Sequence, residues 1–268
     1  MSRNPARRPH PSDHDGPQIP TLGSACWLIR RELGISRATA YTRHGVSTTY
    51  LADIESDRAM PSLEVLEQII NGYRCNPHQA RYLRELRAPA VHLDPPDKLR
   101  ELVTSDTTLT AQLTQLTDRC IFAAYVDPLW NILACNDGFR AALPGLEVTD
   151  CIPTWLFTPL ARQVLIEWES ESARAIATTK PVLARYRDSA QARDIMRRLV
   201  PNKDFRRLWA ARGDVIYGRP ATDLLHIRDP DSGQLISLHV VIAEPGQPYN
   251  TQLLIATPRP YAGSHPTK

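Results

Sequence analysis

The stretch ISRATAYTRHGVSTTYLADIESDRAMPS, residues 35–62, decides how the first third of the chain folds. Ser36 and Ser47 each precede a short run with helical spacing, and a serine in that position caps a helix by accepting a backbone N–H. Gly45 lies between the runs, where a tight turn needs the left-handed backbone that glycine adopts easily. The inward positions of the turn and the second run are apolar: Val46, Leu51 and Ile54. The stretch therefore predicts two short helices joined by a glycine turn, a helix-turn-helix.

Helical spacing continues on both sides of this stretch. The preceding run, which Gly34 ends, carries one apolar face at Leu22, Cys26, Ile29 and Leu33. After the stretch, Ser62 caps a fourth helix and Pro77 opens a fifth. The apolar stripes of these two helices are Leu63, Leu66, Ile69 and Ile70, then Ala80, Leu83 and Leu86. Five short helices over residues 21–87 predict a compact all-α domain.

The whole chain has 268 residues, a length that suggests about two domains. Residues 1–20 are rich in proline and lack apolar periodicity, so we expect a flexible, disordered tail. The Pro-rich segment 88–97 indicates a linker. Residues 98–258 then form the second domain, and residues 259–268 a short tail.

The second domain changes from helical to strand periodicity and back. A helical stretch with a break near Ser105 comes first, and a helix over 136–143 follows two strands. The region 155–212 is mostly helical, with interruptions expected at Pro181 and Pro201. The predicted strands are 120–126, 130–135, 224–227, 235–243 and 252–256. The fold class is therefore α+β in two domains, the second an antiparallel sheet with helices.

Charge and cysteine content restrict the function only weakly. The net charge is +3, and residues 1–90 hold 12 Lys and Arg against 9 Asp and Glu, so a slight basic excess lies in the helical part. Five cysteines without a CxxC pair indicate reduced thiols rather than a disulfide or zinc scaffold. No secretory signal and no run of about 20 apolar residues is present, so we expect a cytoplasmic protein and no membrane partner.

The first domain resembles the XRE-type, lambda-repressor-like helix-turn-helix family. The matching residues are Ile35, Ser36, Ala40, Gly45, Val46, Ser47, Leu51, Ile54, Glu55, Pro61 and Ser62. Two positions depart from the family pattern: Arg37 stands where glutamine is common, and Asp57 where glycine is common. The resemblance implies that the chain binds double-stranded DNA with its second helix of the motif in the major groove.

Positions in the motif suggest roles in DNA binding. Thr48, Thr49 and Tyr50 open the recognition helix and face base edges, while Ser47 caps it and offers its N–H to a phosphate. Arginines of the motif are expected to clamp the DNA backbone. The full predicted set is Arg37, Arg43, Ser47, Thr48, Thr49, Tyr50, Asp53 and Arg58. Glu55 is expected to pair with an arginine of the first helix.

A five-helix module that binds protein instead of DNA is the alternative for this domain. If the domain does bind DNA, it covers too little of the duplex alone for much specificity, so a homodimer reading two half-sites is expected.

The second domain resembles the MmyB-like ligand-binding domain that follows an XRE helix-turn-helix in actinobacterial regulators. The resemblance spans about 97–257 and rests on Trp130, Leu133, Asn136, the run 155–159, Ala161, Arg162, Trp168, Glu169 and the run 204–209. It implies a PAS-like fold that binds a fatty-acyl or other apolar small molecule. Six aromatic residues are candidates to line the pocket: Phe122, Trp130, Phe139, Trp155, Phe157 and Trp168. Each of them could instead fill the core.

No catalytic motif is present: we find no nucleophile elbow, P-loop, HExxH or GxGxxG. We therefore expect no enzyme activity, no cofactor and no metal site. The sequence predicts a DNA-binding transcriptional regulator whose second domain senses a small apolar ligand. The alternative is a DNA-binding adaptor whose second domain binds a protein partner and no small molecule.

Overall fold

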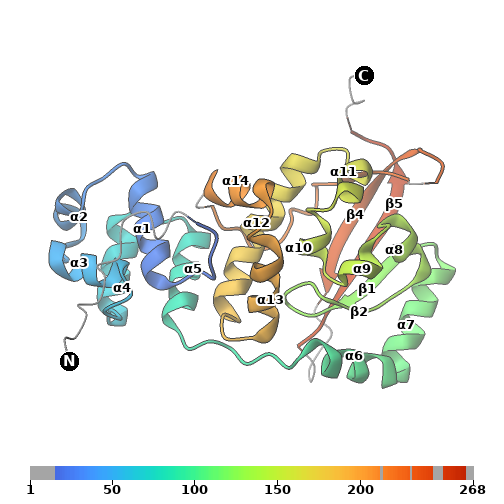
Figure 1. Cartoon of the computed structure of the whole chain (residues 1–268), viewed down its shortest axis with the longest axis horizontal. Coiled ribbons are helices and arrows are strands. Elements are labelled where there is room, and N and C mark those ends of the chain that lie inside the picture. Colours follow the sequence, from blue (N-terminus) through green and yellow to red (C-terminus); the bar gives the residue numbers. More distant parts are fainter. Residues whose placement is uncertain (1–15, 212–213, 230, 244–249, 264–268) are drawn as a thin grey trace, which may run out of the picture.

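The computed structural model describes residues 16–211, 214–229, 231–243 and 250–263. A helical domain and a domain built on a β-sheet lie next to each other, with helix α5 facing helix α12 (Figure 1). The predicted α+β class with two domains is confirmed.

The helical domain holds the five predicted helices. They are α1 Leu22–Glu32, α2 Arg37–His44, α3 Thr48–Glu55, α4 Leu63–Gly72 and α5 Pro77–Arg87. Each begins at a side-chain cap: Thr21, Ser36, Ser47, Ser62 and Asn76. Such caps pair N–H groups that the first helical turn leaves without an internal partner, so local sequence fixes where each helix begins.

The predicted inward residues form the core of this domain, with two exceptions. Leu51, Leu66 and Leu83 are fully buried. Leu33 and Leu63 were predicted to face inward, but they are 39% and 54% exposed. Leu33 caps the end of α1 and Leu63 is the first residue of α4. At a helix end, the apolar face of the helix has no further turn beside it to cover the side chain. Helical periodicity alone therefore predicts burial for these two leucines where the structure exposes them.

The second domain is a five-stranded antiparallel sheet with order β2-β1-β5-β4-β3. Its strands are β1 Phe122–Val126, β2 Ile132–Cys135, β3 Leu225–Arg228, β4 Leu235–Ala243 and β5 Gln252–Pro260. Central β5 pairs with both β1 and β4, which brings the two ends of the domain sequence together. Sheet formation therefore depends on pairing between segments more than 100 residues apart.

In the chain, helices precede β1 and lie between β2 and β3 (Figure 1). They are α6 Pro96–Ser105, α7 Thr107–Asp118, α8 Asp137–Ala142, α9 Leu146–Thr149, α10 Ile152–Trp155, α11 Pro159–Val164, α12 Trp168–Arg185, α13 Ala190–Leu199 and α14 Lys203–Ala211. The predicted break near Ser105 is present, because Asp106 ends α6 and caps α7. Asn136 caps α8 and also bonds the β1 backbone at Ala123, so it ties a strand end to the next helix as expected.

The expected interruption at Pro181 is wrong, because α12 continues through it to Arg185. Proline lacks an N–H, so in a helix it leaves the carbonyl four residues earlier without its usual donor. That carbonyl belongs to Ala177, and it accepts the backbone N–H of Ile216 at 3.1 Å. A segment 35 residues away along the chain thus replaces the missing helical bond.

The described parts of the predicted tail and linker make contacts with the folded domains. Residues 1–15 and 264–268 of the expected tails lie outside the described residues. Ile19 packs against the core of the second domain and Pro20 is buried, although the tail was predicted to extend through residue 20. In the linker, Leu93 is buried and Val91 donates its N–H to the Arg185 carbonyl at 2.8 Å. At the other end, β5 pairs as far as Pro260.

Within the part of the chain that the structure describes, none of the helices combines the length and apolar character needed to span a bilayer.

Candidate functional site

The motif α2–turn–α3 forms as predicted. Gly45 ends α2 in the left-handed conformation, with φ +73°, and Val46 is buried below the turn. The Ser47 hydroxyl then accepts the Tyr50 N–H at 3.2 Å and begins α3. Ser47, Thr48 and Thr49 are exposed, so the start of α3 presents small polar side chains to solvent.

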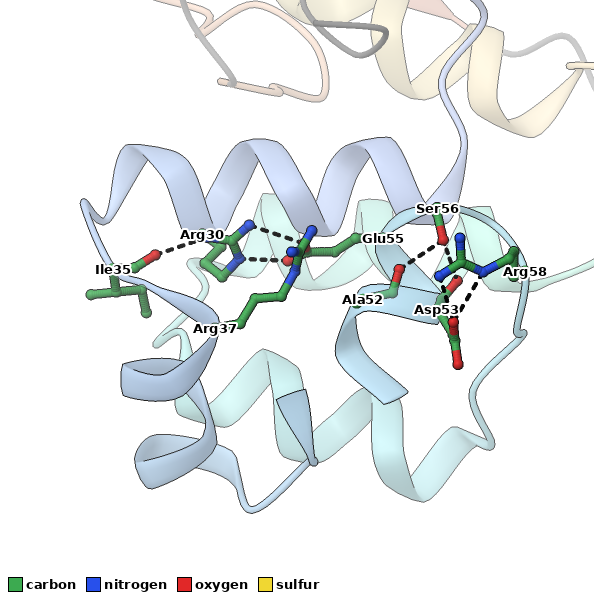
Figure 2. A network of polar contacts seen from close by, with 8 residues as sticks. All are labelled: Arg30, Ile35, Arg37, Ala52, Asp53, Glu55, Ser56 and Arg58. Carbon is green, nitrogen blue, oxygen red and sulfur yellow. Dashed lines mark hydrogen bonds and ion pairs between the residues drawn. The ribbon is translucent and has the colours of Figure 1, made fainter. Parts of the chain in front are cut away.

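A buried carboxylate holds the motif to α1 (Figure 2). The Glu55 side chain at the end of α3 is 1% exposed and accepts two hydrogen bonds from the Arg30 guanidinium, at 2.5 and 2.9 Å. Arg37, the first residue of α2, donates a third at 2.8 Å. Glu55 thus joins three helices, and its hydrogen bonds raise the pKa of Arg30 above the ordinary value. The expected structural pairing of Glu55 with an arginine of α1 is confirmed.

The three predicted phosphate clamps differ in their surroundings. Arg37 keeps 43% of its side chain exposed despite its bond to Glu55. Arg58 is more exposed, and its guanidinium donates to the Asp53 carboxylate at 2.7 and 3.0 Å (Figure 2). Asp53 and Arg58, both in the predicted set, therefore pair with each other. Arg43 lines a surface hollow of about 320 Å³ together with Asn71, Gly72 and Arg74.

His44 is a structural residue of the motif that sequence reasoning missed. Its ring is buried at the end of α2, and Nδ1 accepts the Val46 N–H at 3.1 Å. The ring packs edge-on against Tyr73, with 5.4 Å between centroids. Burial lowers the pKa of His44, so the neutral ring that can accept this bond is favoured. No local pattern marks this role, because it depends on α4 covering the turn.

Asp57, at a position where glycine is common in the resembling family, has a left-handed backbone with φ +55°. Its carboxylate accepts the Gly23 N–H at 2.9 Å and the Thr21 hydroxyl at 2.7 Å. These bonds fix the loop after α3 to the start of α1. The aspartate thus supplies contacts that glycine could not make.

The six candidate pocket residues are divided between core and half-buried positions. Phe139, Trp155 and Trp168 are buried, and both indole N–H groups donate to backbone carbonyls. Half-buried positions are taken by Phe122, Trp130 and Phe157. Phe157 contacts Trp168 edge-on, and the aromatic contacts continue through Phe205 to Trp209. The structure brings Phe157 and Trp168 together and adds two aromatic residues that were not in the predicted set.

An opening on the surface lies beside this aromatic cluster. The hollow measures about 450 Å³ and is lined by Arg162, Gln163, Leu165, Ile166 and Arg228. Arg162 lies over the Trp168 ring, 3.5 Å from its centroid, and pairs with Asp204. The rim therefore carries two guanidinium groups, and buried Leu165 contributes an apolar floor.

The described residues offer no group of three or more His, Cys, Asp or Glu placed to hold a metal ion. The Nδ1 atom of His226 lies 2.9 Å from the Ser237 hydroxyl oxygen, across β3 and β4.

Two family models match the chain. Residues 28–79 match the helix-turn-helix family, and residues 106–266 match the MmyB-like transcription regulator ligand binding domain. A search of curated proteins found no match. The second match covers more than half of the chain, and together the two matches include the motif around Gly45 and the whole sheet. The chain therefore belongs to the MmyB-like transcription regulators and joins a DNA-binding helix-turn-helix domain to a ligand-binding domain.

Proposed function

We propose that the chain recognises a specific operator through the N-terminal end of α3. The observation that carries this proposal is the exposed edge formed by Ser47, Thr48 and Thr49 at the start of α3. The buried Glu55 carboxylate, bonded to Arg30 and Arg37, fixes this helix to α1 and α2. Threonine hydroxyls bond base edges and their methyl groups contact thymine, so this edge suits the major groove. Tyr50 is half-buried and adds a contact at the rim of the same surface.

Arginines around this edge serve as backbone contacts in this proposal. The exposed part of Arg37 lies at the start of α2, where its remaining N–H groups are available to a phosphate oxygen. Arg43 contributes from the hollow beside α4. Arg58 reaches a phosphate by exchanging its exposed pairing with Asp53, which costs little because such surface pairs are worth under about 1 kcal/mol.

Substitutions on a selected operator test this interface. Thr49→Ala should change preference at one or two base positions by about 1–3 kcal/mol each, since it removes a base contact. Arg37→Ala should weaken binding to all sequences evenly and flatten the dependence of affinity on salt. Thr114→Ala and Arg197→Ala, both exposed in the second domain, are matched controls. If affinity and base preference are unchanged in Thr49→Ala and Arg37→Ala, the placement of the interface is wrong.

We also propose a cytoplasmic homodimer as the DNA-binding form. Two copies of α3 would read two half-sites about 34 Å apart or a multiple of that distance. Sedimentation of the protein with and without operator measures the stoichiometry, and a single copy bound to a site without internal symmetry contradicts this proposal.

For the second domain, we propose an apolar small molecule, such as a fatty-acyl compound, as the ligand. The support is the opening lined by Arg162, Leu165 and Arg228. Arg162 also lies over the ring of Trp168, which contacts Phe157. An apolar body with an anionic head would suit this combination of aromatic side chains and guanidinium groups.

An adaptor that binds protein is the second candidate, favoured by the dense packing of the predicted pocket residues. Trp155 and Phe139 are at most 3% exposed, and the indole N–H of Trp155 already donates to the Pro144 carbonyl. Native mass spectrometry of the gently purified protein separates the candidates. A stoichiometric bound lipid supports the sensor, whereas an empty domain that also retains no added acyl compound supports the adaptor.

A further inference from the structure

Each domain packs apolar residues against the core of the other. Val215 and Ala184, which belong to the ligand-binding domain, are buried in the core of the DNA-binding domain. Ile19, which precedes α1, packs in return against the core of the ligand-binding domain. Apolar contacts of this kind couple the stability of two domains, because separating them exposes apolar area on both.

Residues 214–219, which we call the strap, make polar contacts with both domains. Tyr217 donates its hydroxyl to the Glu85 carboxylate at 2.7 Å and its backbone N–H to His78 Nδ1 at 3.2 Å. The Arg81 guanidinium lies over the Tyr217 ring, 3.9 Å from its centroid. All three partners belong to α5, so the Tyr217 side chain and backbone are held by one helix of the DNA-binding domain.

The same strap is fixed to α12 of the ligand-binding domain. Ile216 donates its N–H to the Ala177 carbonyl that Pro181 leaves available. Two residues after Tyr217, the Arg219 guanidinium pairs with the Glu171 carboxylate at 2.6 and 2.7 Å, with both side chains nearly buried. Ile216, Tyr217 and Arg219 therefore make the contacts to α5 and α12 from within one short segment.

We propose that the strap locks α5 to α12, so that the DNA-binding and ligand-binding domains respond to their ligands as one thermodynamic unit. This inference rests on the proposed function for its regulatory meaning: binding in one domain then changes stability and affinity in the other, by linkage. Tyr217 is the central residue, because it joins the backbone anchor at Ile216 to three side chains of α5.

Calorimetry of the full chain tests the lock without any ligand. The wild type should unfold in one transition with equal calorimetric and van't Hoff enthalpies. Tyr217→Ala should split this into two transitions, and hydrogen exchange should assign the earlier one to a single domain. Two transitions in the wild type, or one unshifted transition in Tyr217→Ala, would overturn the proposal.

A double-mutant cycle keeps the test decisive if Tyr217→Ala fails to fold. Tyr217→Phe and Glu85→Ala each remove the same hydrogen bond, the one between the Tyr217 hydroxyl and the Glu85 carboxylate. The double variant should therefore lower the melting temperature by less than the sum of the two separate shifts. The control pairs Tyr217→Phe with Glu67→Ala, which removes the Glu67–Arg84 pair inside the DNA-binding domain. In this control cycle the two shifts in melting temperature should add. If the shifts also add in the cycle of Tyr217→Phe with Glu85→Ala, the result contradicts the role of Tyr217.

A duplex carrying the selected operator tests the linkage itself. Its binding should slow amide exchange in the strap and α12 of the wild type, and should leave both unchanged in Tyr217→Ala. Operator binding that leaves exchange in the wild-type strap and α12 unchanged overturns the linkage. Failure to bind any operator contradicts the proposed function, while the calorimetric result still decides the lock.

Discussion

Single residues with buried polar groups hold α3, whose start is the proposed DNA-binding edge, against α1 and α2. Glu55 is nearly inaccessible to solvent yet accepts bonds from two guanidinium groups, whereas Asp53, two residues earlier, pairs with Arg58 at an exposed position. Removing one partner of a buried pair leaves the other desolvated without compensation, while an exposed pair exchanges readily with water. The two carboxylates of α3 therefore differ in importance, although they look alike in the sequence.

Glu55→Ala should lower the free energy of unfolding by about 3–5 kcal/mol, because it leaves Arg30 without its buried partner. Asp53→Ala should change it by less than about 1 kcal/mol. Urea unfolding of both variants provides the comparison, and similar losses for the two would show that burial of Glu55 is not what stabilises the motif.

His44 predicts a pH dependence of stability. Because burial lowers the pKa of the folded imidazole, the unfolded chain binds a proton at a pH where the folded chain does not. The free energy of unfolding should therefore fall as pH drops below about 6.5, the ordinary value for histidine. His44→Gln, measured against the wild type by urea unfolding between pH 5 and 8, should lose this component. Identical pH profiles would refute the assignment.

At the scale of elements, close backbone approach explains why α1 and α3 sit where they do. A Cβ on Gly23 would lie 2.5 Å from the Ile54 carbonyl and 2.7 Å from an Asp57 carboxylate oxygen. By contrast, Gly34 at the end of α1 has φ +64° and open space around it. One glycine is needed for space and the other for backbone conformation.

Gly23→Ala should cost more stability than Gly34→Ala. The first forces α1 away from α3, an overpacking effect of about 1–3 kcal/mol or more. The second adds a left-handed alanine, at about 1–2 kcal/mol. Operator affinity separates the variants further, since displacement of α1 disturbs the Arg30–Glu55 contact and Gly34→Ala leaves it in place. Equal operator affinities would argue against this coupling.

Elements with local signals were predicted well, and those that depend on distant partners were not. Caps at Ser36, Ser47 and Ser62 mark helix starts in the sequence itself, and the structure places them there. Continuation of α12 through Pro181 was unforeseeable, because the donor that satisfies Ala177 comes from Ile216. A proline ends a helix unless another segment of the chain replaces the hydrogen bond that the proline cannot make.

At the scale of the whole molecule, contacts between domains carry no sequence signal. Ile19 is a single apolar residue and Val215 begins a short apolar run that ends at Tyr217, and neither pattern indicates which core receives the side chain. The six candidate pocket residues show the same limit, since spacing identifies aromatic residues but cannot separate buried Trp155 from half-buried Trp130. The geometry of the helix-turn-helix motif was predictable because α2, the turn and α3 are contiguous in the sequence.

Selection of genomic fragments by the full-length protein, followed by sequencing, tests the central claim most directly. The account predicts a recurrent operator whose base preference shifts in Thr49→Ala and persists in Thr114→Ala. Fragments that share no sequence, or an operator whose preference is unaffected by substitutions at the start of α3, would contradict it.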